Sequence, residues 1–345
     1  MRIQTIVMQF GKFFRKVAYV CAGVITLLGA IVCLQGQTPP DETEVPNQPI
    51  PQTTIRVKVN MISLPVVVTA RNGEYVKDLK QEDFEIFEDG VRQEIAGFAA
   101  VEAPVSVALM LDTSGSTQQQ LNRIRNDAVR FIRLLRADDS LAALSFADEV
   151  TLWEPFDIYH RKNEDAFRKI KPGGMSAVYE AVWLALEQVL KLEYGRKALV
   201  LLSDGVDNRS DTVSKQETLD LAKKTDASIY CVYFNTDRDT RPRGRAQIPG
   251  ARLPIPLPRE KRPEYAAGKQ YMQDLASLSG GLFVDASKNN NLNEAFGKIL
   301  QELWNQYSIG YYPKELKRDG KFHEITIKVK RPNLTVRSRH GYYDY

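Results

Sequence analysis

The segment "ALMLDTSGST" at residues 108–117 ends an apolar run at an aspartate, and hydroxyl side chains follow at four of the next five positions. A second apolar run, "KALVLLSD" at residues 197–204, ends in the same way at Asp204. Such runs predict buried strands that end in a loop. In a sheet of parallel strands covered by helices, ligands bind beyond the carboxyl ends of the strands. Asp112 and Asp204 are therefore expected to lie together at one edge of a sheet.

Buried strands alternate with amphipathic helices between residues 103 and 306. We expect strands at 105–112, 140–147, 150–154, 197–203, 228–234 and 281–285. We expect helices near 118–136, 163–170, 176–193, 212–226, 269–279 and 291–306. Strands that are apolar throughout and separated by helices indicate a sheet covered on both faces. The sequence thus predicts an α/β fold with a doubly wound, mostly parallel six-stranded sheet flanked by helices.

Strand patterns of a different kind flank this region, at residues 55–102 and 307–345. They are short alternating or β-branched runs, separated by turn signals. The "EDG" of residues 88–90 and the "RDG" of residues 318–320 are predicted hairpin turns. We expect the two flanks to pair into one small β-sandwich-like domain, with the α/β domain inserted between them. Two separate β appendages are the alternative.

The first 36 residues have the pattern of an export signal. The basic segment "KFFRK" at residues 12–16 precedes an uncharged apolar stretch at 17–34, and a polar, proline-rich linker follows at 37–54. The apolar stretch lies near the short end of the roughly 17–25 residues that span a bilayer. Residues 1–36 are therefore a signal peptide or an N-terminal membrane anchor. Either one predicts an exported protein that is periplasmic, cell-surface or secreted, or is anchored to the inner membrane.

Composition limits the class of partner and the compartment. The formal net charge of +4, from 47 basic and 43 acidic residues, is too small an excess to predict nucleic-acid binding. Cys21 and Cys33 lie in the N-terminal segment, so Cys231 is expected to be a buried structural thiol. An exported protein without disulfides fits a bacterial envelope. Residues 236–269, rich in proline and arginine, predict a long exposed basic loop that is either disordered or functional. As a functional loop, it would offer an acidic partner a docking edge.

Oxygen-bearing side chains gather where the two aspartates are expected to meet. Two carboxylates from neighbouring strands repel each other unless a positive charge lies between them. Ser114 and Ser116 alternate after Asp112 in a turn that contains Gly115, and Ser176 follows two glycines at the start of a helix, where its alternative role is an N-cap. Hydroxyl and carboxylate oxygens are hard donors. These residues predict a Mg²⁺ site, with Mn²⁺ or Ca²⁺ as alternative ions.

The order and spacing of these residues resemble the metal-ion-dependent adhesion site of von Willebrand factor type A domains. The matching series is Asp112, Ser114, Ser116, Ser176 and Asp204, and the resemblance covers roughly residues 103–306. With its β flanks, the chain is similar to the secreted or anchored bacterial proteins described as von Willebrand factor A-related domain proteins.

The resemblance implies a role for each of the five residues. It implies that Ser114 and Ser116 bind the metal directly, and that Asp112 and Asp204 bind partly through water. It places Ser176 where the family usually has threonine, and it leaves the sixth position to a carboxylate from a partner. The chain departs from the family pattern at one point, because Met175 separates Ser176 from the preceding glycine.

Enzyme signatures do not occur in the sequence. It contains no G-x-x-x-x-G-K, no H-E-x-x-H and no G-x-S-x-G. A phosphatase that uses Asp112 as its nucleophile would need a second aspartate at position 114, where a serine stands. His160, His323 and His340 are isolated from all of these motifs, so surface or β-domain roles are expected for them. We predict that the protein is not an enzyme.

These observations together predict a divalent-cation-dependent protein-binding module of the bacterial envelope. Its bound Mg²⁺ would take an Asp or Glu side chain of a protein partner, and only the N-terminal segment would contact a membrane. The alternative is a structural or assembly scaffold in which the metal site is vestigial and the β domain or the basic loop makes the contacts.

Overall fold

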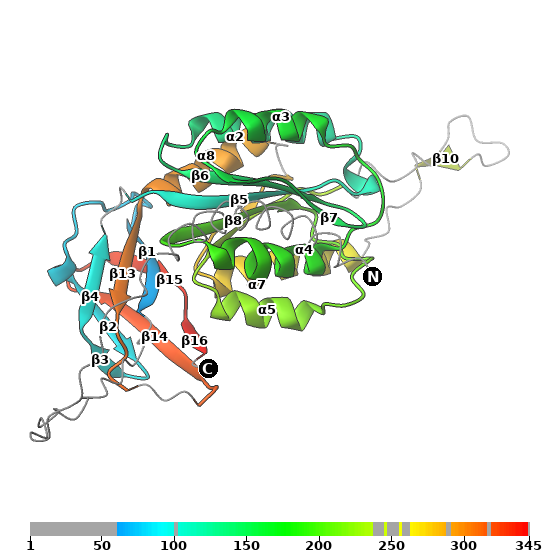
Figure 1. Cartoon of the computed structure of the whole chain (residues 1–345). Helices are drawn as coiled ribbons and strands as arrows, with labels where there is room; N and C mark the ends of the chain where they lie inside the picture. The colour runs from blue at the N-terminus through cyan, green and yellow to red at the C-terminus, as the bar shows by residue number, and fades with distance from the viewer. Residues whose placement is uncertain are drawn as a thin grey trace, which may run out of the picture. The chain divides into compact units, whose positions relative to one another are not determined.

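A six-stranded sheet forms the centre of the α/β domain (Figure 1). The computed structural model describes residues 61–99, 103–236, 245–246, 255–256, 263–287, 291–315 and 319–343. In spatial order the strands are β12 (Phe283–Asp285), β9 (Ser228–Tyr233), β8 (Arg196–Ser203), β5 (Val105–Asp112), β6 (Ser140–Phe146) and β7 (Val150–Asp157). Neighbouring strands are parallel except for β6 and β7. The mostly parallel sheet predicted from the sequence is confirmed.

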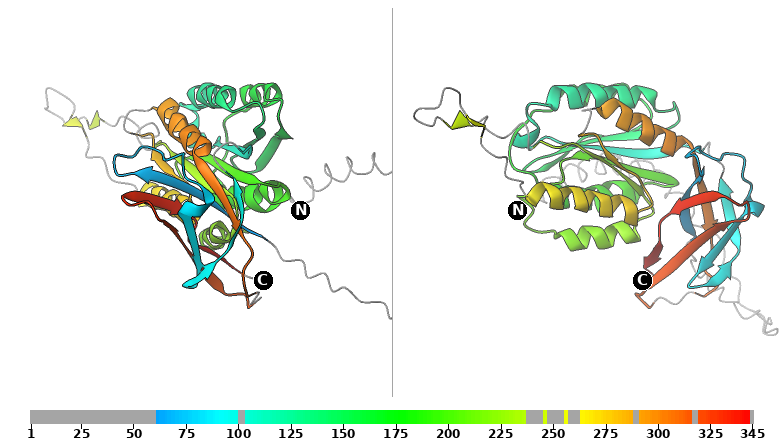
Figure 2. Two further views of the ribbon diagram at one scale, coloured as in Figure 1. Left: turned by 90° about the vertical axis from the view of Figure 1, so that its left-hand side faces the viewer. Right: turned by 180° about the vertical axis from the view of Figure 1, so that it is seen from behind.

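Helices cover both faces of the sheet, as the views in Figures 1 and 2 show. One face carries α2 (Leu121–Leu134), α3 (Arg161–Lys169) and α8 (Leu292–Trp304). The other face carries α4 (Val178–Leu184), α5 (Lys215–Lys224) and α7 (Pro263–Leu278). Successive side chains of β5 serve the two cores in turn, since side chains alternate along a strand: Leu109 packs with the first set and Met110 with the second. The apolar stripe predicted for the first helix is buried, including Ile124 and Phe131.

Two helices differ from their predicted form. Beyond α4 the chain continues as a π-helical turn, Ala185–Val189, and a 3₁₀ turn, Leu190–Leu192, so the helix expected at 176–193 is irregular. α7 begins at Pro263, well before the expected start at 269, because proline is suited to the first position of a helix. The loop predicted at 236–269 is therefore shorter than expected, because its last residues, from Pro263 on, are helical. Within it, β10 (Arg245–Ala246) pairs with β11 (Ile255–Pro256), and most of the rest lies outside the described residues.

Strands from both ends of the chain pair in two antiparallel sheets. The first contains, in spatial order, β15 (Leu334–Ser338), β1 (Ile62–Ala70), β13 (Gln306–Tyr311) and β4 (Ile95–Ala99). The second contains β16 (Gly341–Tyr343), β14 (Phe322–Val329), β2 (Phe84–Glu88) and β3 (Val91–Gln93). Both sheets contribute to one apolar core, which includes Leu64, Ile86 and Tyr307. Each sheet mixes strands from before and after the α/β domain, so the flanks form one β sandwich and not two appendages.

One of the two predicted hairpin turns is confirmed and one is wrong. Asp89 and Gly90, with φ of 48° and 81°, join the antiparallel strands β2 and β3 in the left-handed conformation that a two-residue hairpin loop requires. The segment around 319–320 lies between β13 and β14, which belong to different sheets. It therefore connects two layers and not two paired strands.

Buried polar contacts join the β sandwich to the α/β domain. Glu302 of α8, which is 4% exposed, accepts a hydrogen bond from the Tyr75 hydroxyl at 2.9 Å and pairs with Arg337 of β15. Arg339, also buried, donates to the carbonyl oxygen of Thr225 at 3.0 Å, just beyond the end of α5. These contacts help to make the two domains one compact unit.

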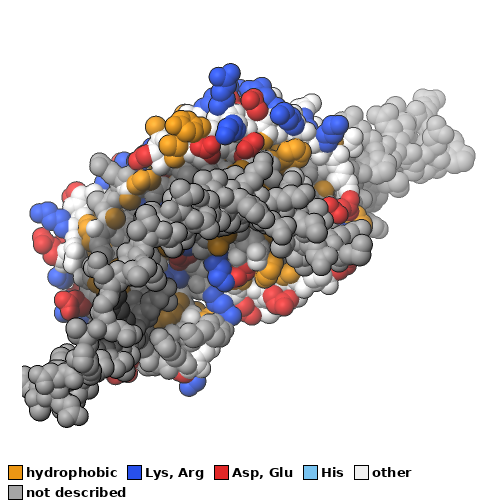
Figure 3. All heavy atoms as spheres, in the orientation of Figure 1, with side chains coloured by type: hydrophobic (Ala, Val, Ile, Leu, Met, Phe, Trp, Pro, Cys, Tyr) orange, Lys and Arg blue, Asp and Glu red, His pale blue; other side chains and the backbone are white. Residues whose placement is uncertain are grey.

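The buried cysteine, the length of the helices and the surface charges relate to the predicted compartment and partners. Cys231 lies fully buried in β9, as expected, and burial raises the pKa of its thiol. None of the helices in the described ranges is long and apolar enough to cross a membrane, and residues 17–34 lie outside those ranges. Basic and acidic side chains are interspersed on the surface formed by α2 and α3 (Figure 3), where Arg133 pairs with Glu164 at 2.7 Å.

A close backbone contact between α7 and the loop after β8 gives a testable prediction. A Cβ atom at Gly268 would lie 2.6 Å from the carbonyl carbon of Gly205 and 2.8 Å from the carbonyl oxygen of Asp204. We predict that Gly268→Ala lowers the free energy of unfolding by about 2 kcal/mol, because overpacking displaces this loop. In α8, an added methyl group at Gly297 meets nothing within 4 Å.

Gly297→Ala is the matched control, since it makes the same change inside a helix with free space. It should raise the free energy of unfolding by roughly 0.5–1 kcal/mol through helix propensity alone. Urea denaturation of the two variants measures both effects, and a shift in the same direction for both would contradict the close contact.

Candidate metal centre

Two adjacent parallel strands deliver two carboxylates to the same edge of the sheet. Asp112 is the last residue of β5, and Asp204 directly follows β8, with Leu111 opposite Leu202 in the register of the two strands. The two aspartates are 0% and 1% exposed. The structure therefore places Asp112 and Asp204 together at one edge of the sheet, as the sequence predicted.

Serine hydroxyls connect the two carboxylates. The Ser114 hydroxyl donates to Oδ1 of Asp112 at 2.6 Å, and its oxygen lies 3.1 Å from the hydroxyl oxygen of Ser116. The Ser116 hydroxyl in turn donates to Oδ2 of Asp204 at 3.1 Å. Four side chains thus form one continuous line of oxygen atoms. Ser114 is 3% exposed and Ser116 is partly exposed, so the line opens to solvent on the Ser116 side.

The structure also brings Ser176 to this edge. Its hydroxyl oxygen lies 3.4 Å from Oδ2 of Asp112, and its backbone N–H donates to Oδ1 of Asn208 at 2.7 Å. The N-cap position of α4 is Ala177 and carries no side-chain cap, so the alternative role of Ser176 as the cap is wrong. Met175, the departure from the family pattern, is 47% exposed and does not displace the Ser176 hydroxyl from the site.

Backbone hydrogen bonds hold the loops after β5 and before α4 together. The N–H of Gly115 donates to the carbonyl oxygen of Gly174 at 2.9 Å, and the N–H of Gly173 donates to that of Thr113 at 2.9 Å. Gly174 has a φ of 81°, and a Cβ atom there would lie 2.1 Å from Oδ2 of Asp148. Gly174 therefore allows the loop before α4 to lie against the turn between β6 and β7, which contains Asp148.

Sequence reasoning missed three residues of this site. The Ser203 hydroxyl donates to Oδ2 of Asp112 at 2.6 Å, the Thr236 hydroxyl donates to Oδ2 of Asp204 at 2.5 Å, and Asn208 positions Ser176. A signal for two of them was present. Ser203 directly precedes Asp204, and Thr236 follows β9, which ends at the same carboxyl edge as β5 and β8. Thr236 could have been predicted from the rule that ligands bind beyond the carboxyl ends of parallel strands, because it follows β9.

Burial and mutual repulsion disfavour the charged forms of both aspartates. Burial, followed by the charge of Asp204, raises the pKa of Asp112 to about 7. Burial also raises the pKa of Asp204. Within the described part of the chain, no lysine, arginine or histidine pairs with either carboxylate. Three hydroxyl oxygens and two carboxylates without a basic partner are a donor set that fits a hard divalent cation.

Comparison with known proteins identifies the domain. Residues 106–251 match the family model of the von Willebrand factor type A domain. The chain therefore contains a domain of this family, as the sequence motif predicted. No curated protein sequence matches the chain.

Several solved structures are similar to the chain at low sequence identity. The conserved hypothetical protein BatB from Bacteroides thetaiotaomicron is 17% identical, with a TM-score of 0.42, over 58% of this chain and 98% of that one. The von Willebrand factor domain of the type V pili tip protein Mfa5 from Porphyromonas gingivalis is 13% identical, with a TM-score of 0.43, over 57% and 94%. Proximal thread matrix protein 1 from the mussel byssus, described as having a zinc-occupied MIDAS motif, is 17% identical, with a TM-score of 0.43, over 62% and 49%.

The raised pKa of Asp112 predicts how the stability of the metal-free protein, measured with a chelator present, depends on pH. The folded protein keeps a proton on Asp112 up to about pH 7, whereas the unfolded chain releases it near 3.8. The stabilising contribution of this proton is complete below pH 3.8 and is lost as pH rises to about 7. In Asp112→Asn this contribution is absent, so the stability of the variant relative to the wild type should increase by about 3 kcal/mol as pH rises from 5 to 8.

Urea denaturation of both proteins with a chelator, at several pH values, measures this difference. Addition of Mg²⁺ at pH 8 should then stabilise the wild type and leave Asp112→Asn unchanged. Identical pH dependences for the two chelated proteins would contradict the account of the buried pair.

Proposed function

We propose that the von Willebrand factor A domain of this chain binds Mg²⁺ and, through it, an acidic side chain of a protein partner. The observation that supports this most strongly is the pair of buried carboxylates, Asp112 and Asp204, joined through serine hydroxyls and without a basic partner among the described residues. Asp112, Ser114, Ser116, Ser176 and Asp204 would hold the ion. Mn²⁺ and Ca²⁺ take the same kinds of ligand and are the alternative ions.

The hydroxyls of Ser114 and Ser116 can bind a cation without a change of backbone conformation. In the structure, the Ser114 and Ser116 hydroxyls donate hydrogen bonds to Asp112 and Asp204, and each hydroxyl oxygen keeps a lone pair that can bind a cation. The same orientation suits a hydroxyl that donates to a carboxylate and offers its oxygen to a cation. The bound ion supplies the positive charge that the two carboxylates lack.

The open side of the site is where a partner would bind. Asp112, Ser114 and Ser176 are each no more than 3% exposed, whereas Ser116 is partly exposed, so one coordination position of the ion would face solvent. A carboxylate from a partner would gain a charge-assisted contact there, since a bound cation is the largest local charge in such a site. We propose on this ground that the partner presents Asp or Glu, and that the domain binds and does not catalyse.

The proposed function belongs to an exported protein. Residues 1–36 would act as a signal peptide or an inner-membrane anchor, and the linker at 37–54 would give the folded part reach. The folded part would divide into β flanks at 55–102 and 307–345 around an α/β domain at 103–306. We propose the bacterial envelope as its compartment.

Titration calorimetry of the full-length chain with Mg²⁺ and Mn²⁺ tests the metal site. We expect one Mg²⁺ per chain, and we expect Asp112→Ala, Ser114→Ala to abolish Mg²⁺ binding because two of the five proposed ligands are removed. Asp220→Ala, Ser277→Ala is the matched control, since it removes the same groups from the surfaces of α5 and α7. Equal binding by the site variant, or no binding by the wild type, would rule out this metal site.

Capture of partners from an envelope extract tests the binding mode. We expect chelator to release the captured protein, Mg²⁺ to restore capture, and the Asp112→Ala, Ser114→Ala chain to capture nothing. Capture that persists in chelator would support the scaffold alternative, in which the β sandwich or the basic loop makes the contacts.

A further inference from the structure

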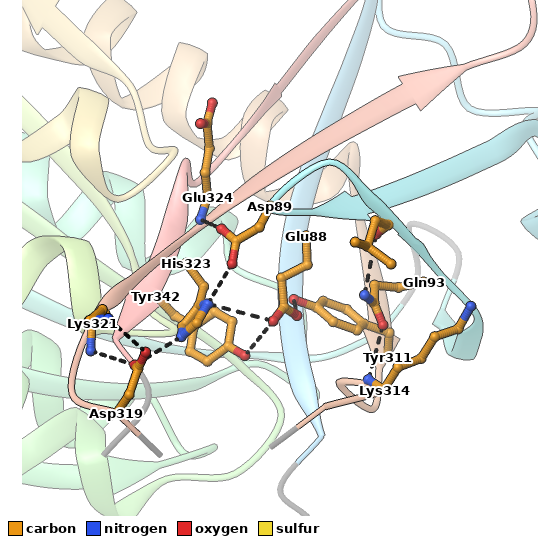
Figure 4. Close-up of polar contacts among 11 residues, drawn as sticks. Glu88, Asp89, Gln93, Tyr311, Lys314, Asp319, Lys321, His323, Glu324 and Tyr342 are labelled. Carbon is orange, nitrogen blue, oxygen red and sulfur yellow. Dashed lines mark hydrogen bonds and ion pairs between the residues drawn. The ribbon is translucent and has the colours of Figure 1, made fainter. Parts of the chain in front are cut away.

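A second group of ionisable side chains lies in the β sandwich, in the sheet that contains β2, β14 and β16. Glu88, Asp89 and His323 each place one ligand atom within 4.8 Å of the other two (Figure 4). Among the described residues, this is the one set of three or more His, Cys, Asp or Glu side chains with that geometry. We call it the Glu88–Asp89–His323 cluster.

The conformation of the hairpin turn brings the two acidic residues of the cluster to the same side. Neighbouring side chains in a regular strand point to opposite faces of the sheet. Glu88 ends β2, and Asp89 follows in the left-handed region with a φ of 48°, which re-aims its side chain. Both carboxylates therefore approach His323, which lies on the neighbouring strand β14 (Figure 4).

The imidazole of His323 is buried against both carboxylates. Its Nδ1 lies 2.8 Å from Oδ2 of Asp89 and 3.9 Å from Oε1 of Glu88. His323 and Glu88 are only 3% and 5% exposed. Ligand atoms around a tetrahedral Zn²⁺ lie about 3.3 Å apart when the metal–ligand distances are about 2.0–2.1 Å. Small rotations of the Asp89 and Glu88 side chains would therefore admit an ion at Nδ1.

Hydrogen bonds to Glu88 and Asp89, and an ion-pair contact to His323, orient the three groups from outside the cluster. Tyr311 and Tyr342 donate their hydroxyls to the two oxygens of Glu88, at 2.7 Å and 3.2 Å. The backbone N–H of Glu324 donates to Oδ1 of Asp89 at 3.0 Å, which leaves Oδ2 directed at the imidazole. On the far side of the ring, Nε2 of His323 lies 3.4 Å from Oδ1 of Asp319. A histidine that binds metal through one nitrogen commonly has its other nitrogen paired with a carboxylate in this way.

The charges of the cluster favour a divalent cation over a proton. Three carboxylates, those of Glu88, Asp89 and Asp319, surround one imidazole, which carries at most one positive charge. Asp319 also pairs with Lys321 at 3.6 Å, so its charge is shared with a basic side chain. A protonated His323 then carries a single positive charge beside the two negative charges of Glu88 and Asp89. A divalent cation in place of the Nδ1 proton would balance Glu88 and Asp89, with Asp319 holding the Nε2 proton.

We propose that Glu88, Asp89 and His323 bind one first-row divalent cation of the Zn²⁺ class, with Asp319 as the residue that positions His323. One nitrogen and two carboxylate oxygens suit Zn²⁺ better than Mg²⁺, which prefers oxygen ligands alone. The ion would join the β2–β3 hairpin, which precedes the α/β domain, to β14, which follows it. The site therefore serves as a structural clasp between the two flanks, independently of the ion at Asp112.

Equilibrium dialysis of the full-length chain against Zn²⁺ tests this proposal, in an Asp112→Ala background that removes the first site. We expect one Zn²⁺ per chain and a higher melting temperature with the ion. Co²⁺ in place of Zn²⁺ should give the visible absorption bands of a four-coordinate ion. His323→Asn keeps a donor for Asp89 but removes the ligand, so it should lose both the ion and the bands. Asp319→Asn should weaken Zn²⁺ binding by about 10- to 100-fold.

His340→Asn is the matched control, because His340 is an exposed histidine of the same sandwich. It should bind Zn²⁺ as the parent chain does. The proposal is overturned if the Asp112→Ala chain binds no Zn²⁺, or if folded His323→Asn, checked by circular dichroism, binds Zn²⁺ as tightly as its parent. Neither result would bear on Mg²⁺ binding by the wild-type chain, since that measurement uses the other site.

Discussion

The repulsion between two buried carboxylates is the constraint on which the α/β domain's functional edge depends. Asp112 and Asp204 arrive on adjacent strands, and the surrounding protein supplies hydroxyl and backbone donors but no basic partner among the described residues. Hydrogen bonds of this kind reduce the cost of burial but do not remove the net charge. A protonated aspartate or a bound cation can do so. We propose that the site switches between a bound proton and a bound ion, and that only the ion would offer a coordination position to a partner.

The β sandwich joins the two segments that flank the α/β domain and contacts that domain. Its two sheets each take strands from both ends of the chain, so the sandwich closes only when both flanks are present. Buried Glu302, which contacts Tyr75 and Arg337, extends polar contacts across the junction. The proposed clasp at Glu88, Asp89 and His323 would reinforce the same closure from the opposite sheet. One ion would then serve binding and the other stability.

The sequence predicted what depends on local pattern and missed what depends on pairing between distant segments. The edge of the sheet and four of its residues follow from apolar runs that end at Asp112 and Asp204, and Ser176 follows from the two glycines near it and from the family resemblance. Thr236 was missed because the rule was applied to two strands only. Nothing local to His323 indicates Glu88, because 235 positions separate them and only the pairing of β14 with β2 brings them together. The start of α7 at Pro263 could not be predicted from composition, because a proline-rich segment is typical of a loop, whereas a single proline also suits the first position of a helix.

The most direct test of a cation at the Asp112–Asp204 edge is the anomalous diffraction of crystals grown with Mn²⁺. The account predicts a manganese peak within bonding distance of the hydroxyl oxygens of Ser114 and Ser116, with the carboxylates of Asp112 and Asp204 beside it. Absence of such a peak, with Ser116 still hydrogen-bonded to Asp204 and the two carboxylates sharing only protons, would contradict it.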